Sequence, residues 1–123
     1  MMAEAEARLL AGLIKVIKAN SRGWIEAVEA VSEDGMPIAH ESDEERFNPE
    51  YIAAAVAAIC GAITAVIELM NARGYKRLSI QLEDKRYILI REYRKHYIVC
   101  LTKPNPNLGF IDILMEAYLA EQE

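Results

Sequence analysis

The side chains that could do chemistry are few, and their spacing predicts no catalytic site. The two histidines, His40 and His96, fall on different predicted strands and have no acidic residue at ligand or relay spacing. An acid–base catalyst must lie within hydrogen-bonding reach of the group it serves, so we predict that both are surface or strand-end residues. There is no glycine-rich phosphate loop and no Cys-x-x-Cys motif. We therefore predict a protein that is not an enzyme and holds no cofactor.

Charged residues give two further candidates for chemistry. One predicted loop carries four closely spaced acids, Glu41, Asp43, Glu44 and Glu45. Such a run could bind a metal ion, but consecutive acids in a loop are usually solvated, and we predict no metal site. Arg46, Arg91 and Arg94 could each act as an arginine finger toward a nucleotide phosphate. Nothing in their spacing singles one of them out.

Composition points to one domain over residues 1–123 that stays in the cytoplasm. Fifty-three percent of its 123 residues are apolar, which argues against disorder and is enough for a core without disulfides. Cys60 and Cys100 lie inside apolar runs, so we interpret both as reduced core residues; a disulfide or metal pair is the alternative. Residues 1–8 are charged and contain no apolar run, so no export signal is expected there.

The net charge of −5 is unevenly distributed along the chain. Residues 24–72 hold ten acids and one base, whereas residues 73–103 hold nine bases and three acids. The simpler interpretation is solvated loops and strand edges; the alternative is two oppositely charged surfaces, one of which steers a partner. Nucleic acid is not an expected partner, because the overall sign is wrong and the basic residues lack an interleaved glycine–aromatic signature.

The element that must organise the rest is a long apolar helix over residues 48–74. Asn48 suits the N-cap, Pro49 the first helical position and Glu50 the positive end of the helix dipole. Gly74 is predicted to take the left-handed conformation that closes the helix, directly after Arg73. Residues 51–67 carry no charge, so a membrane span is an alternative, although this length is at the lower limit for crossing a bilayer.

This helix is apolar on two opposite faces. Large residues form one stripe, predicted to face the core: Ile52, Val56, Ile59, Ile63, Ile67 and Met70. Small residues form the opposite stripe: Ala54, Ala58, Gly61 and Ala65. A surface helix normally has one apolar and one polar face, so the small stripe also needs a cover. Small residues permit close approach of another helix, and a second copy of the chain is the expected cover.

The remaining pattern predicts an α/β sandwich with a five-stranded antiparallel sheet and helices on both faces. Helices are expected over residues 3–20 and 110–119, strands over 24–31, 36–40, 76–82, 86–93 and 96–102, and an acidic loop over 41–47. Pro37 cannot donate to a ladder and predicts an edge strand. Strands 86–93 and 96–102 are apolar on both faces, as in a sheet covered on both sides. The element order is α-β-β-α-β-β-β-α.

Three segments of this sequence resemble the Roadblock family. They are the hairpin AVSEDGMPIA at residues 30–39, the alanine-rich helix at 51–70 and the segment NPNLGF at 105–110. The resemblance spans nearly the whole chain, and its hairpin is the most specific part. It implies a symmetric dimer, with a second copy or a related Roadblock chain, in which central helices pair and third strands join edge to edge. It also implies binding of a Ras-like small GTPase near the paired helices.

The resemblance assigns residues to two predicted surfaces. The dimer interface takes the small stripe together with the third strand: Ala54, Ala58, Gly61, Ala65, Leu78 and Ile80. The partner surface takes the flank of the helix beside it: Tyr51, Ala55, Ala62 and Leu69. The expected function is a non-enzymatic, dimeric GTPase-binding scaffold or regulator. The alternatives are a small-molecule sensor, which would need a cavity between helix and sheet, and a dynein-type light-chain adaptor.

Overall fold

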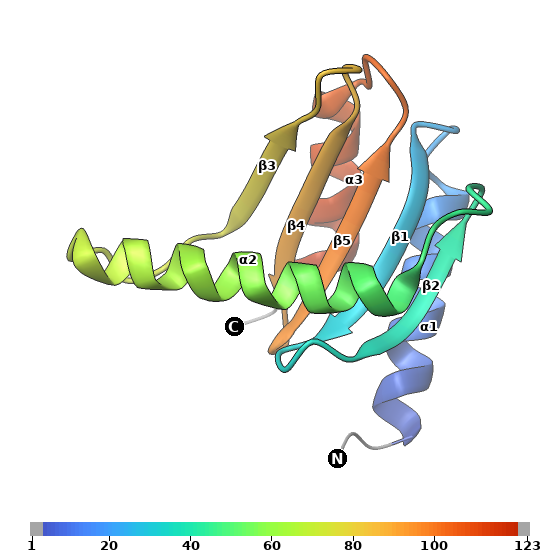
Figure 1. The fold of residues 1–123 in the computed structure, drawn as a ribbon. Coiled ribbons are helices and arrows are strands. Elements are labelled where there is room, and N and C mark those ends of the chain that lie inside the picture. The colour runs from blue at the N-terminus through green and yellow to red at the C-terminus, as the bar shows by residue number, and fades with distance from the viewer. Residues whose placement is uncertain (1–3, 121–123) are drawn as a thin grey trace.

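Five antiparallel strands form one sheet, and helices cover both of its faces (Figure 1). The computed structural model describes residues 4–120. The elements are α1 (Glu4–Ala19), β1 (Ile25–Ser32), β2 (Pro37–Ser42), α2 (Pro49–Leu69), β3 (Arg77–Gln81), β4 (Tyr87–Tyr93), β5 (His96–Thr102) and α3 (Leu108–Leu119). This order and the sandwich architecture confirm the fold class predicted from the sequence.

The strands lie in the order β2-β1-β5-β4-β3, and every neighbouring pair is antiparallel. Pro37 is the first residue of β2, which forms one edge of the sheet. At an edge, the missing amide of proline does not remove a hydrogen bond between two interior strands. β3 forms the other edge, and its polar residues Ser79 and Gln81 are exposed. β1 and β5 lie between partner strands and account for most of the buried strand residues. The two edges are thus the least apolar strands, as expected for sheet termini.

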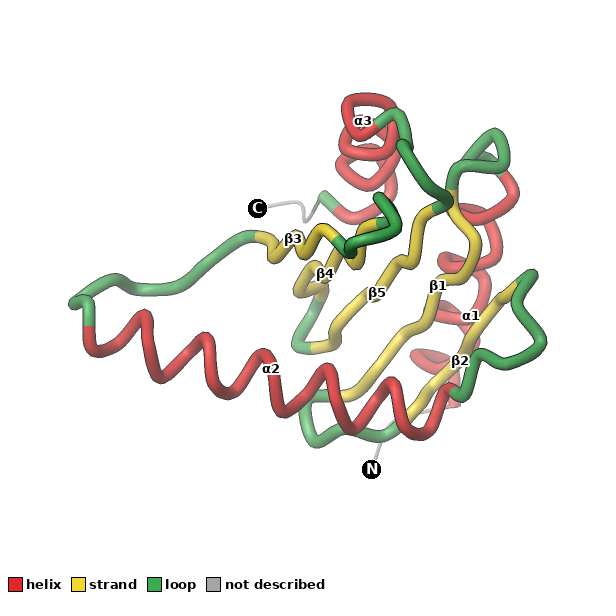
Figure 2. Tube along the Cα trace, turned by 45° about the horizontal axis from the view of Figure 1, so that its top comes forward, coloured by secondary structure: helices red, strands yellow, loops and turns green. Residues whose placement is uncertain are grey.

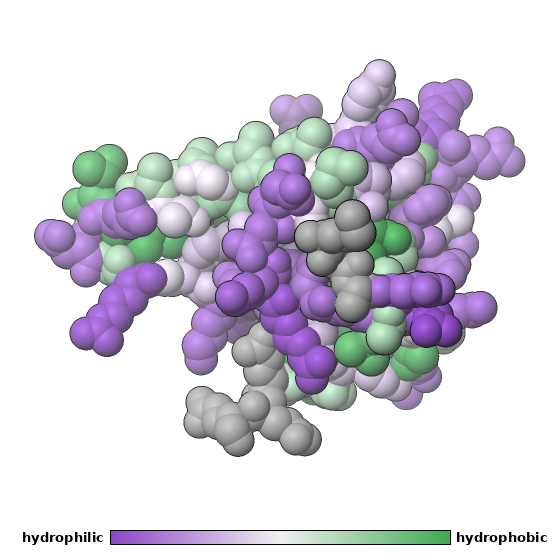
Figure 3. Space-filling view, turned by 90° about the horizontal axis from the view of Figure 1, so that it is seen from below, coloured by the Kyte–Doolittle hydropathy of each residue, from purple (hydrophilic) through white to green (hydrophobic). Residues whose placement is uncertain are grey.

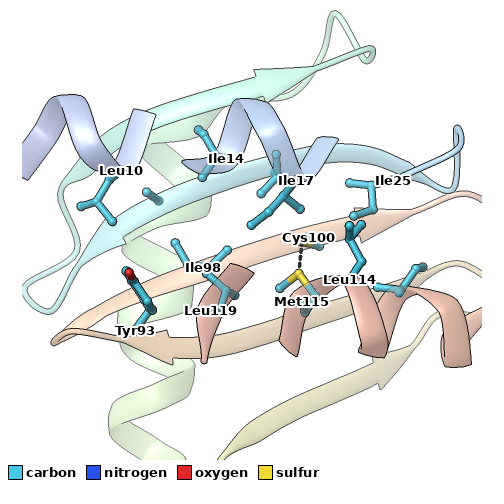
Figure 4. Packing of buried hydrophobic residues seen from close by; sticks show 13 residues of the cluster. Leu10, Ile14, Ile17, Ile25, Tyr93, Ile98, Cys100, Leu114, Met115 and Leu119 are labelled. Atoms are coloured by element: carbon cyan, nitrogen blue, oxygen red, sulfur yellow. Dashed lines mark hydrogen bonds between the residues drawn. The ribbon is translucent and has the colours of Figure 1, made fainter. Parts of the chain in front are cut away.

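The main core lies between the sheet and the pair α1 and α3. Figure 4 shows side chains from both helices pointing onto β1 and β5. Its fully buried members include Leu10, Ile14, Ile17, Ile25, Ile98 and Ile111. The Cys100 thiol lies 3.8 Å from the Met115 sulfur within this core. Cys60 and Cys100 are both free and buried, which confirms the prediction of reduced core cysteines.

A second, smaller core lies between the sheet and α2, which runs across the strands on the opposite face (Figures 1 and 2). Its buried members are Val31, Ala53, Val56, Cys60, Ile90 and Val99. The β1–β2 turn passes beneath α2, where a Cβ at Gly35 would lie 3.2 Å from the Ala57 Cβ. Gly35 also has φ +88°, so glycine is needed there for both space and conformation.

Several predicted boundaries are wrong by a few residues. Glu41 and Ser42 belong to β2, where they pair with β1, so the acidic loop is shorter than predicted. Gly74 does not close α2; instead Asn71 takes the left-handed conformation, with φ +60°. The Ala72 and Asn71 amides donate to Ile67 and Glu68 carbonyls at 3.0 Å, which is the Schellman arrangement. The last helix begins two residues early, at Leu108; the predicted start of the first helix at residue 3 lies outside the described residues.

Candidate protein interface

Helix α2 is held by strong local signals at both ends. The Asn48 side chain accepts a hydrogen bond from the Tyr51 amide at 3.2 Å, and Pro49 occupies the first helical position. These are the predicted N-terminal signals, and the structure confirms them. The helix has 21 residues, which at 1.5 Å per residue gives a length of about 31 Å. The helix is therefore longer than the sheet is wide, since five strands about 4.8 Å apart span about 19 Å.

Only the first half of α2, residues 49–60, is buried against its own sheet. Its fully buried residues are Ala53, Val56 and Cys60. The second half projects past β3 (Figures 1 and 2). Leu69 and Met70 at its end are 84% and 71% exposed. The predicted core stripe is therefore wrong in two respects. First, the residues that face the core include the small residues Ala53 and Cys60, whereas only large residues were predicted there. Second, Met70 faces solvent, because no strand lies beneath that turn.

The small stripe is open to solvent along its whole length. Ala54, Ala58, Gly61 and Ala65 are all exposed. A Cβ built at Gly61 would meet no described atom within 4 Å beyond its own helix and chain neighbours. The monomer thus leaves room for another backbone to approach this stripe. The assignment of these four residues to a dimer interface stays a prediction, because the structure contains a single chain.

The sheet also leaves apolar surface uncovered beside the projecting half of α2. Leu78 pairs with Ile90, and Ile80 pairs with Ile88, so all four side chains share the α2 face of β3 and β4. Only Ile90 is fully buried; the other three are partly exposed. The exposed apolar end of α2 and the partly exposed apolar edge formed by β3 and β4 therefore lie on the same face of the molecule. Figure 3 shows the apolar surface along α2 and at its projecting end.

The four predicted partner-binding residues lie on α2 and are exposed. Tyr51 is 75% exposed at the start of the helix and Leu69 is 84% exposed at its end. Ala55 and Ala62 are exposed between them. These positions can take part in a protein contact, and their role stays a prediction. By length and composition alone, α2 could also span a membrane.

The acidic segment before α2 is bound to its own chain rather than arranged around a metal site. Lys18 Nζ lies 2.9 Å from the Asp43 carboxylate, and this ion pair holds the pKa of Asp43 below its ordinary value. The Glu44 carboxylate accepts a hydrogen bond from the Arg46 amide at 3.0 Å. Among residues 4–120, the structure brings no three acidic, histidine or cysteine side chains together as metal ligands.

The histidines have acidic neighbours that the sequence spacing did not reveal. His96 is buried at the start of β5, and its Nε2 lies 3.5 Å from the Glu6 carboxylate of α1. His40 is exposed on β2, directly opposite Glu29 of β1, and its ring centroid lies 6.3 Å from that of Phe47. Both positions confirm the prediction of surface or strand-end residues, since His40 is exposed and His96 is the first residue of β5. Their acidic neighbours come from α1 and β1, which are distant in the sequence, so spacing could not reveal them.

The candidate arginine fingers have different surroundings. Arg91 forms an ion pair with Glu116 of α3 at 2.5 Å, and Arg94 lies over the Tyr93 ring at 5.3 Å. Arg46 is exposed in the loop before α2. Arg91 therefore helps to dock α3 onto the sheet. None of the three is brought to a phosphate-binding loop.

A buried acid and an open cleft are features that the sequence reading missed. Glu29 is fully buried in β1, and burial raises its pKa to about 8. Alternation along the strand puts Glu29 on the same face as Ala27 and Val31. Only the order of the strands in the sheet shows that β2, β5 and α2 surround this position. A cleft of about 730 Å³ opens between the first turns of α1 and the β1–β2 and β4–β5 turns. It lies at the ends of the hairpins rather than between α2 and the sheet, where a sensor would need it.

Comparison with known proteins identifies the fold. Residues 18–102 match the Roadblock/LC7 domain family. The structure is similar to Myxococcus xanthus MglB, with a TM-score of 0.86 and 13% identity over 96% of this chain and 87% of that chain. It is also similar to a structure described as MglB with tetrameric arrangement, with a TM-score of 0.82 and 13% identity over 98% of this chain and 89% of that chain. The structure is also similar to the gliding protein MglB from Thermus thermophilus, with a TM-score of 0.79 and 14% identity over 98% of this chain and 90% of that chain. No curated protein matches the chain.

Proposed function

Because the chain belongs to the Roadblock/LC7 domain family, we propose that it acts as a dimer that binds a Ras-like small GTPase. In this proposal the protein supplies a binding surface rather than catalytic residues, and it scaffolds or regulates the GTPase in the cytoplasm. The observation that carries the proposal is the uncovered state of α2. Its second half and its small stripe are exposed, although both are apolar.

A second copy of the chain fits this uncovered surface better than lipid does. The small stripe allows two α2 helices to approach closely, and the projecting half of each helix can cover Leu78 and Ile80 of the other sheet. Covering a large exposed side chain such as Met70 contributes about 1.5–3 kcal/mol. Glu50 and Glu68 bound the apolar stretch closely and oppose membrane insertion.

Pairing of β3 edges would extend the sheet across the dimer. β3 is an edge strand in the monomer and presents unpaired backbone groups. Its side chains Leu78 and Ile80 lie on the α2 face, where the partner's helix would cover them. One of the similar structures is described as having a tetrameric arrangement, which supports self-association on this fold.

The GTPase surface is the helix flank that carries Tyr51, Ala55, Ala62 and Leu69. In the paired arrangement this flank lies beside the seam between the two α2 helices and is doubled by symmetry. Apolar area there would supply affinity, and the neighbouring acids Glu44 and Glu45 would speed the encounter with a basic partner. The expectation of a GTPase comes from the family resemblance.

The proposal is tested by capture followed by direct binding. Immobilised protein is incubated with lysate of its native cell containing either GDP or a GTP analogue, and bound small GTPases are identified and purified. The double variant Tyr51→Asp with Leu69→Lys should then lose binding of the purified GTPase while its mass in solution stays that of the wild type. Ile113→Asp is the control, since Ile113 is 71% exposed on α3, on the other face of the sheet. Undiminished binding by the double variant would move the GTPase site away from α2.

A further inference from the structure

The carboxyl group of Glu29 is the most unusual polar group in the described chain. The residue is 0% exposed, and neither carboxyl oxygen has a hydrogen-bond partner among residues 4–120. It lies in the middle of β1, between β2 and β5. An ionised carboxylate without a partner is strongly disfavoured in such a place, so the group lies on the sheet as the neutral acid.

The side chain of Glu29 points toward α2. Across the sheet Glu29 lies opposite Val99, and Val99 packs in the cluster that contains Ala53 and Val56 of α2. Residues opposite one another on neighbouring antiparallel strands share a face. The first half of α2, the half that is docked on the sheet, therefore covers the carboxyl group.

No charged group of the packed elements offsets the buried acid. β2 places His40 opposite Glu29, but the imidazole is exposed and lies beside Phe47. β5 contributes Tyr97, two residues from Val99 along the strand, and α2 contributes the Cys60 thiol; burial raises the pKa of both. Neither of these carries a positive charge. Burial alone therefore accounts for the raised pKa of Glu29, about 8 against an ordinary value of 4.5.

We propose that Glu29 is a proton-operated latch beneath the first half of α2. The neutral acid allows the helix to lie on the sheet. When that half of the helix lifts, water reaches the carboxyl group, its O–H bond breaks and the proton passes to water. The carboxylate is then solvated, with His40 as the basic side chain directly opposite it on the edge strand. Docking of α2 takes one proton up and opening releases it.

The direction of the pH effect follows from the two pKa values. The docked state, with a pKa of about 8, holds the proton more tightly than the open state, with a pKa near 4.5. The stability of docking is complete below about pH 4.5 and is lost progressively as the pH rises to about 8. Over that interval the opening equilibrium increases about tenfold per pH unit, and above it the equilibrium levels off.

The test combines a titration with hydrogen exchange on the purified wild-type chain. The Glu29 carboxyl carbon is followed by NMR between pH 4 and pH 10. Protection of the α2 amides near Val56 and Cys60 is measured between pH 6 and pH 9, with each rate corrected for the intrinsic pH dependence of exchange. Glu29→Gln keeps the shape of the side chain but cannot ionise. Glu92→Gln makes the same change at an exposed position on β4 and serves as the control.

The latch predicts that Glu29 titrates near pH 8 and that opening of the first half of α2 rises about tenfold per pH unit up to that value. This pH dependence should be absent in Glu29→Gln and present in Glu92→Gln. Titration of Glu29 near pH 4.5 would overturn the proposal, and that measurement needs no variant. Protection that is independent of pH in the wild type, with a high pKa, would also overturn it, since the acid would then be buried without controlling α2.

Discussion

Replacing Gly61 with leucine should have opposite effects on the helix and on the dimer. Gly61 lies in the interior of α2, where glycine is about 0.8–1.0 kcal/mol less favourable than alanine, and leucine is nearly as good as alanine. Within one chain a Cβ at this position meets no described atom within 4 Å beyond its own helix and chain neighbours. The isolated monomer should therefore tolerate Gly61→Leu and gain up to about 1 kcal/mol in helix stability.

The dimer should instead be weakened by the same change. If the small stripe meets its twin, the leucine enters a space sized for a bare backbone, and overpacking of this kind costs about 1–3 kcal/mol. Since 1.4 kcal/mol corresponds to a tenfold change in Kd, the dimer should weaken by about 5-fold to 150-fold. Sedimentation velocity over a dilution series gives the Kd. Urea unfolding well below the Kd gives the stability of the monomer.

Gly12→Leu provides the matched control. Gly12 is an exposed interior glycine of α1, and a Cβ there also meets no described atom within 4 Å beyond its own helix and chain neighbours. This variant should gain helix stability without any change in Kd. If Gly61→Leu dimerises as tightly as the wild type while its helix is stabilised, the small stripe faces solvent in the assembly. The account of the interface would then be refuted.

Three further predictions concern the local structure and the absence of catalysis. Asn48→Ala removes the cap of α2 and should lower the free energy of unfolding by about 1 kcal/mol in urea titrations; an unchanged midpoint would show that the cap is dispensable. His40→Ala and His96→Ala should leave any stimulation of GTP hydrolysis close to wild type, and a loss beyond about 100-fold in a folded variant would reveal a chemical role. Because burial raises the pKa of Cys60, and raises that of Cys100 to about 12, neither thiol should react with Ellman's reagent at pH 8 until the protein unfolds; prompt reaction would contradict their placement in the core.

The elements of this fold were predictable because their signals are local. Asn48 and Pro49 begin α2, and Pro37 identifies an edge strand, without reference to any distant residue. The end of α2 was less predictable, because asparagine and glycine both adopt the left-handed conformation and the chain offers Asn71 before Gly74. Both residues can supply the left-handed position that closes a helix, and the sequence alone does not rank the two.

The candidate interface was predictable only in part. The small stripe, read from helical spacing, is exposed as expected. Which residues face the core depends on where α2 crosses the sheet and how far it projects, and periodicity does not contain that information. For this reason Cys60 is buried and Met70 is exposed, against the prediction. Glu29 was missed for a related reason, since its burial requires neighbours from β2, β5 and α2 together.

The central claim is that a second copy of the chain covers α2, and the mass of the purified protein in solution tests it most directly. Sedimentation equilibrium at micromolar concentration in neutral buffer measures that mass without reference to shape. The account predicts a particle of twice the 13.8 kDa chain, which dissociates on dilution. A particle of 13.8 kDa throughout the concentration series would contradict it, because the exposed apolar half of α2 would then stay uncovered by its own kind.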